Sequence, residues 1–187
     1  GQEEARIVYD NHIENLLSRE KNYIYVDVGG GSTEIILIHQ GELKCSKSYN
    51  VGTVRMLNGA VRSENLKVMR KEIAAAAAKY PGLIIIGSGG NINKLYRLAD
   101  EKDKEASTFS VDALRTLYES LKQYSSEERR KLFKLKPDRA EVIVPAAEIF
   151  LDVAKHAKSE LIWVPTIGLA DGIIDSLYTR NLEKSSK

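Results

Sequence analysis

The residues best suited to chemistry lie together in segment 27–34. Three consecutive glycines are followed by two hydroxyl side chains and flanked by two carboxylates: Asp27, Gly29, Gly30, Gly31, Ser32, Thr33 and Glu34. Glycines let the backbone approach a ligand closely and reach positive φ, and successive amides in such a turn form a concave anion site. The hydroxyl groups add donors. The carboxylates suit a metal-bound phosphate or an attacking water, so the segment predicts a phosphate site.

The same segment has a plainer interpretation as a tight hairpin turn. The apolar runs 23–28 and 35–38 predict a strand on either side of the glycines, and a glycine-rich turn between two strands explains three glycines equally well. Asp27 on one side and the Ser-Thr-Glu sequence on the other favour the phosphate site.

A second glycine segment, Gly-Ser-Gly-Gly at residues 87–90, follows the short apolar run 83–86. That run has the pattern of a strand buried on both faces, and residues 91–99 read as a helix. A glycine turn between a strand and a helix presents free N–H groups and a positive dipole end to an anion. Gly89 and Gly90 are therefore candidate phosphate-binding residues. An ordinary strand-to-helix turn packed closely by small residues explains the same pattern.

The remaining pattern predicts the elements that position these segments. Strands are expected at 23–28, 33–39, 42–50, 83–86 and 161–164, and helices at 3–20, 54–57, 65–80, 91–99, 111–124, 127–133, 139–157 and 169–178. A polar linker is expected at 100–109, a kink or boundary at Pro145, and close packing of the alanine run 74–78 on the sheet. Three antiparallel strands followed by alternating helices and strands predict a mixed α/β sheet with helices on both faces. Ligands of such sheets bind at the carboxyl ends of the strands, where both glycine segments lie.

Composition limits the classes of function. The chain has 187 residues, 43% of them hydrophobic, and a net charge of +2, which predicts one domain over 1–180 with a frayed tail at 181–187. No basic run points to nucleic acid, and no apolar run reaches the roughly 18 residues of a membrane span. Cys45 is the single cysteine, so a cytoplasmic location is expected. A domain that opens inside a helix suggests a fragment of a longer protein.

Five segments together resemble the Ppx/GppA family of exopolyphosphatases and guanosine-pentaphosphate phosphohydrolases, within the actin, sugar kinase and heat-shock ATPase superfamily. The matching segments are residues 1–6 (G-x-E-E-A-R), 27–34 (D-V-G-G-G-S-T-E), 52–55 (G-x-V-R), 87–90 and 138–143. The octapeptide 27–34 is the specific one. Members carry two ribonuclease-H-like domains, and the D-x-G-S-N-S loop of the first is absent here. The chain therefore resembles the second ribonuclease-H-like domain alone, with the N-terminal domain missing.

The resemblance implies roles for particular residues. It makes Glu4 the catalytic base that positions the hydrolytic water, with Glu34 as a second catalytic acid. It places Asp27 and Glu34 by the metal, expected as Mg²⁺ or another divalent cation, and the run from Gly30 to Thr33 on the phosphate chain. Without the resemblance, Glu4 reads as a helix-dipole partner. Arg55 stays open between a phosphate ligand and a surface ion pair.

Three functions remain compatible with these residues. The first is hydrolysis of a terminal phosphoanhydride of polyphosphate or guanosine pentaphosphate by the full-length protein, with this chain nearly inactive alone. The second is a non-catalytic sensor of a phosphate-rich nucleotide such as guanosine tetraphosphate, and the third is a kinase. Glu4 and Glu34 favour hydrolysis, because a sensor has no use for a water-orienting carboxylate. The choice of substrate and the oligomeric state stay open, with a homodimer among the options.

Overall fold

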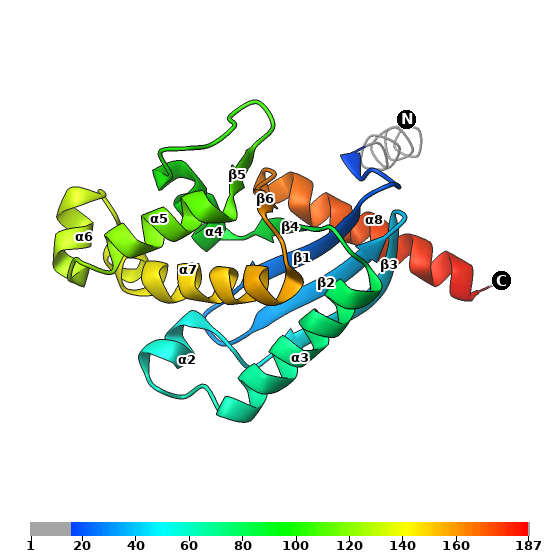
Figure 1. Cartoon of the computed structure of the whole chain (residues 1–187), viewed down its shortest axis with the longest axis horizontal. Helices are drawn as coiled ribbons and strands as arrows, with labels where there is room; N and C mark the ends of the chain where they lie inside the picture. The colour runs from blue at the N-terminus through cyan, green and yellow to red at the C-terminus, as the bar shows by residue number, and fades with distance from the viewer. Residues whose placement is uncertain (1–15, 187) are drawn as a thin grey trace.

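The computed structural model describes residues 16–186, which form one six-stranded sheet in the order β3-β2-β1-β4-β6-β5 (Figure 1). The strands are β1 (Asn22–Val28), β2 (Thr33–His39), β3 (Glu42–Tyr49), β4 (Leu83–Ser88), β5 (Thr108–Ser110) and β6 (Leu161–Trp163). β1, β2 and β3 are antiparallel neighbours, while β1, β4 and β6 run parallel. The predicted mixed sheet is confirmed.

The helices connect and cover the strands. They are α2 (Thr53–Leu57), α3 (Ser63–Lys79), α4 (Gly90–Leu98), α5 (Val111–Leu121), α6 (Ser126–Leu132), α7 (Pro137–Ala157) and α8 (Ile167–Ser185). Each lies where the sequence pattern predicts a helix. The predicted opening helix at 3–20 falls almost wholly outside the described residues. No helix of the described chain has the length and hydropathy needed to cross a bilayer.

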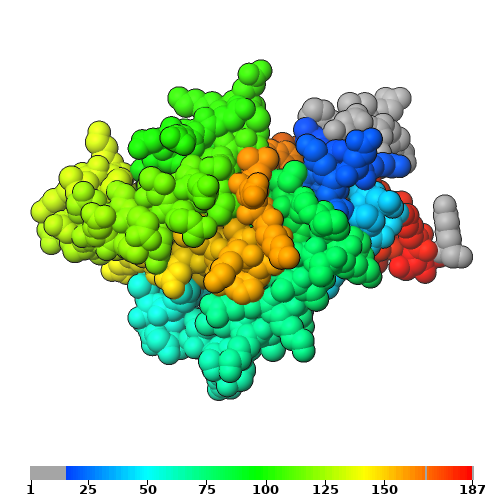
Figure 2. Space-filling model, viewed as in Figure 1, coloured from blue at the N-terminus to red at the C-terminus, as the bar shows by residue number. Residues whose placement is uncertain are grey.

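The sheet has helices on both faces, as predicted. Ile24, Val26 and Val28 of β1 point into a large core with α3, α4, α5 and α7, because alternate residues of a strand face opposite sides. Tyr23 and Tyr25 point the other way, into a smaller core with α8. Figure 2 shows the first face from outside, where α7 (yellow to orange) lies between α5 (green) and α3 (teal). The sheet is therefore a central layer with helices packed on each of its faces.

The structure corrects three expectations about the elements, in whole or in part. The linker 100–109 contains the start of β5, which pairs antiparallel with β6; a three-residue strand is too short to show a period of two. The alanine run packs on the core only in part, because Ala77 is buried and Ala76 lies against the core while Ala74, Ala75 and Ala78 are exposed. Helix α7 continues through Pro145, so the boundary offered as one alternative at this proline is not present.

The predicted frayed tail after residue 180 is also wrong up to Ser185, because α8 stays helical to that residue. An ion pair between Lys184 of α8 and Glu42 of β3 attaches the last turn of this helix to the edge of the sheet. Ser185 Oγ donates to the carbonyl of Asn181 at 2.9 Å within the same turn. The stabilising interaction comes from a strand more than 140 positions away, so local sequence does not show it.

Candidate phosphate-binding site

The first glycine loop, residues 29–32, joins β1 to β2 at the carboxyl end of β1. The Gly29 amide donates to the Ser32 carbonyl at 2.9 Å and closes the turn. The start of α2 then folds onto the loop: the amides of Thr53 and Val54 donate to the carbonyls of Gly29 and Gly30 at 3.0 and 2.9 Å. These bonds take up the loop's carbonyls and fix its shape.

Close contact, and not a left-handed backbone, favours glycine at positions 29 and 30 of this loop. Positive φ among the described glycines occurs at Gly41, Gly59, Gly82 and Gly89 and at none of residues 29–31, so the expectation of positive φ in this loop is wrong. A Cβ on Gly30 would lie 3.1 Å from Val54 Cγ2, and one on Gly29 would lie 3.3 Å from the Ser32 carbonyl oxygen. The segment that follows β3 packs directly on Gly30, whereas a Cβ on Gly31 would make only an ordinary contact, 3.9 Å from Arg55 Nε.

The backbone donors of this loop are available to a ligand. Within the described residues, the amides of Gly30, Gly31 and Ser32 donate to no acceptor. Three successive unpaired amides in one turn are the arrangement that binds an anion. Because the neighbouring carbonyls are already paired with α2, the amides are held in place before any ligand arrives.

The two hydroxyl side chains of the segment have different surroundings. Thr33 is buried, and its Oγ1 donates to the Val51 carbonyl at 2.7 Å. Its hydroxyl therefore supports the loop from the core side and does not face a ligand. Ser32 is half-exposed, and its Oγ donates to Glu34 Oε1 at 3.2 Å.

The two carboxylates lie side by side. Asp27 and Glu34 are direct partners across the β1–β2 pair, and opposite residues of an antiparallel pair point to the same face. That face is the one covered by α8. Burial raises the pKa of Asp27, and the charges of Glu34 and then Asp171 on α8 raise it further. Asp171 is a third acid near the site that the sequence pattern did not single out.

These acids fit a divalent cation held jointly with a ligand. Among residues 16–186, no group of three or more histidines, cysteines and acids is placed to hold a metal without help. Glu34 Oε1 already accepts from Ser48 Oγ at 2.6 Å and from Ser32, which leaves Oε2 for another partner. Two carboxylates plus water and phosphate oxygens is the usual environment of Mg²⁺, and a cation between Asp27 and Glu34 would remove their repulsion.

The second glycine loop, residues 87–90, lies beside the first. Asp27 and Ser88 are register partners in the parallel β1–β4 pair. Gly89 is the N-cap of α4 and has a φ of 95°. Glycine is required there for two reasons: any other residue would be strained at this φ, and a Cβ would lie 2.7 Å from Asp27 Oδ1. The prediction that both glycine segments lie at the carboxyl ends of the strands is confirmed.

Arg139 adds a cation to the second loop. This residue lies in the first turn of α7 and donates from Nη1 to Asn91 Oδ1, while Asn91 Nδ2 donates to the Val28 carbonyl at 3.0 Å. A Cβ on Gly90 would lie 2.6 Å from Arg139 Nη2. Arg139 lies in segment 138–143, which resembles the family, but the sequence assigned this arginine no role. About 50 positions separate it from the loop.

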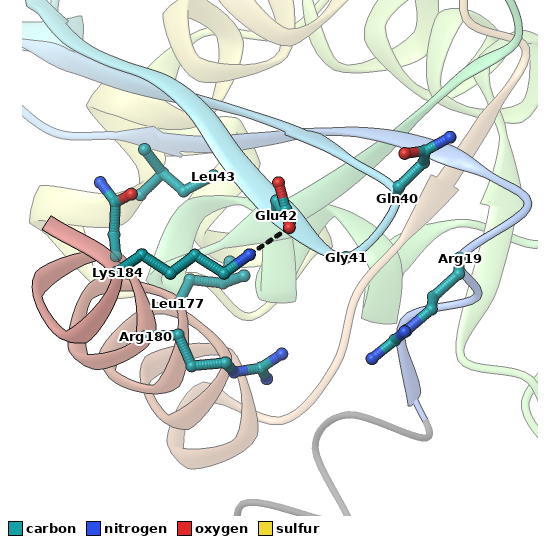
Figure 3. A pocket seen from close by; sticks show the side chains of 9 residues that line it. Arg19, Gln40, Gly41, Glu42, Leu43, Leu177, Arg180 and Lys184 are labelled. Atoms are coloured by element: carbon teal, nitrogen blue, oxygen red, sulfur yellow. Dashed lines mark hydrogen bonds and ion pairs between the residues drawn. The ribbon is translucent and has the colours of Figure 1, made fainter. Parts of the chain in front are cut away.

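A cavity of about 290 Å³ lies elsewhere, at the turn between β2 and β3 (Figure 3). Arg19 and Arg180 point toward one another across it, and Lys184 pairs with Glu42 at its wall. Hydrogen bonds from Lys184 and Lys44 lower the pKa of Glu42 to about 2. The cavity is at the other end of β2, roughly 20 Å from the glycine loop at 3.3 Å per residue. It is separate from the candidate phosphate site.

Comparisons with known proteins support the same family throughout the chain. The family model described as the Ppx/GppA phosphatase family matches residues 1–181. Exopolyphosphatase 2 of Mycobacterium tuberculosis is 25% identical over 95% of this chain and 62% of its own length. A guanosine-5'-triphosphate,3'-diphosphate pyrophosphatase of Aeromonas hydrophila is 34% identical over 42% of this chain and 16% of its own.

Solved structures show that the fold is shared. The type II variant of the Aquifex aeolicus Ppx/GppA phosphatase has a TM-score of 0.64 at 22% identity, covering 82% of this chain and 56% of that one. An exopolyphosphatase from Cytophaga hutchinsonii also has a TM-score of 0.64, at 20% identity, and the match covers 84% of this chain and 57% of that one. The predicted ribonuclease-H-like fold class is therefore confirmed. The chain belongs to the Ppx/GppA phosphatase family.

Proposed function

We propose that this chain binds the terminal phosphates of inorganic polyphosphate or guanosine pentaphosphate and takes part in hydrolysing the last phosphoanhydride bond. The observation that carries the proposal is the set of three unpaired amides, at Gly30, Gly31 and Ser32, beside the carboxylates of Asp27 and Glu34. Family membership supports the reaction class. The names of the relatives, one an exopolyphosphatase and another a pyrophosphatase of a guanosine nucleotide, support the two substrates.

Each group in the site would have a defined role. Phosphoryl transfer depends mostly on positioning and on neutralising charge. The loop amides would hold the phosphate oxygens, and Arg139 would add positive charge beside the second loop. Asp27 and Glu34 would hold Mg²⁺ or another divalent cation, which would neutralise charge on the phosphates. Glu4, which lies outside the described residues, would accept the proton of the water that attacks phosphorus as the bridging P–O bond breaks.

We further propose that a preceding domain supplies the opposite wall of the site. The chain spans 62% of the length of its mycobacterial relative, and it has no counterpart of the first-domain phosphate loop. A transferring phosphoryl group needs preorganised donors on more than one side. The isolated chain is therefore expected to fold and bind phosphate weakly but to turn over very little substrate.

Phosphate release tests the proposal. The full-length protein and the 187-residue chain would be assayed with polyphosphate and with guanosine pentaphosphate, with and without Mg²⁺. We expect metal-dependent release by the full-length protein and almost none by the chain. Tight binding without release by the full-length protein would instead support a sensor of guanosine tetraphosphate. Full activity of the chain alone would contradict the two-domain site.

A further inference from the structure

Arg55 is attached to the first glycine loop at two points. Its backbone amide donates to the Gly30 carbonyl at 3.2 Å, and its Nε donates to the Gly31 carbonyl at 2.7 Å. The residue is exposed and belongs to the short helix α2 that folds over the loop. An exposed arginine normally samples many rotamers, but the Nε bond confines this side chain to the edge of the loop.

The same bond leaves most of the guanidinium unused. An arginine side chain has five N–H donors, and the bond to Gly31 uses the one on Nε. Within the described residues, the two terminal nitrogens make no hydrogen bond, and no carboxylate forms an ion pair with Arg55. The alternative role of Arg55, a surface ion pair, is therefore not supported, because no acid in residues 16–186 pairs with it.

We infer that Arg55 is a phosphate-binding residue, whose terminal nitrogens contact the oxygens of the phosphate chain held on the amides of Gly30, Gly31 and Ser32. This inference rests on the proposed function and names a further contact to the same substrate. Guanidinium groups match phosphate oxygens in geometry and charge. The anchored side chain loses little entropy when a ligand arrives, which favours binding.

The inference is tested by titrating the 187-residue chain with pyrophosphate and following its amide chemical shifts. Arg55→Gln removes the charge but retains the backbone bond to Gly30. Because hydrogen bonds to a charged group are among the stronger ones, we expect pyrophosphate to bind roughly 10-fold more weakly or worse. The matched control is Arg97→Gln, which changes net charge equally at the exposed end of α4 and should leave the affinity within about twofold.

The outcomes separate this inference from the proposed function. If the wild-type loop does not respond to pyrophosphate, the proposed function fails. If the wild type responds and Arg55→Gln binds equally well, the proposed function stands and the inference is overturned. If Arg55→Gln displaces the loop before ligand is added, weaker binding alone would not show a direct contact, and the salt dependence of binding distinguishes a direct contact from a change in loop shape. Removing a cation that binds the anion makes the affinity less sensitive to salt, and an unchanged salt dependence would overturn the inference.

Discussion

Replacing Glu4 with glutamine in the full-length protein is expected to lower kcat by about 10²–10⁴-fold while substrate binding is retained. Glutamine has nearly the same shape as glutamate but cannot accept the proton of an attacking water. Steady-state phosphate release would give kcat, and binding of guanosine tetraphosphate, followed by calorimetry, would show that the site is intact.

The neighbouring Glu3 provides the control for this variant. The sequence pattern puts both acids at the start of a predicted helix, where an acid contributes about 0.3–1 kcal/mol through the helix dipole. Glu3→Gln should therefore keep kcat within a few-fold and change only stability. Equal rates for the wild type and Glu4→Gln would reduce Glu4 to a helix-dipole acid and remove the general base from the mechanism.

Gly30→Val is expected to abolish detectable binding of pyrophosphate to the first loop and to destabilise the fold by about 1–3 kcal/mol. A Cβ at this position would lie 3.1 Å from Val54 Cγ2, and valine adds two methyl groups beyond it. Gly52 also packs closely on Gly30, since a Cβ on Gly52 would lie 2.4 Å from the Gly30 carbonyl oxygen, so the backbone around Gly30 is already crowded. Heat denaturation would give the stability, and an amide-shift titration the affinity.

Gly31→Ala is the matched variant for this position. A Cβ on Gly31 would lie 3.9 Å from Arg55 Nε, which is ordinary van der Waals contact, and its φ is not in the left-handed region. Stability and pyrophosphate affinity should both stay close to those of the wild type. Normal binding by Gly30→Val would show that the anion does not depend on the shape of this loop.

The strands and both glycine segments could be predicted because their signals are local. β1 and β2 read as nearly continuous apolar runs because each strand has a core on both faces, and a glycine segment marks the end of β1 and of β4. The cross-strand pairing of Asp27 with Glu34 then follows from the hairpin register. Their placement on one face was therefore available from the sequence.

The parts that could not be predicted depend on packing between distant segments. Positive φ was expected at residues 29–31, but none of the three has it. Glycine is needed at position 30 because Val54, in the segment after β3, packs closely on it. Thr33 was expected to face the ligand, and its hydroxyl instead bonds to Val51 in the core. Amino-acid types permit either arrangement, and the packing of α2 on the loop selects one.

Arg139 and Asp171 are site residues that local sequence could not identify, for the same reason. Both lie on helices whose residues at these positions look like ordinary surface charges in sequence. Arg139 reaches the second loop because α7 packs against α4, and Asp171 influences Asp27 because α8 covers that face of the sheet. Only the packing of these two helices against the rest of the domain brings the charges to the glycine loops.

An amide-shift titration of the wild-type chain with pyrophosphate tests the central claim most directly. The nest of amides in the first loop is local backbone geometry that is already fixed by α2, so binding should be weak, salt-sensitive and observable without a second domain. The account predicts that the largest shifts lie at Gly29 to Thr33. Shifts that cluster at Gly87 to Asn91 and leave Gly29 to Thr33 unchanged would contradict it.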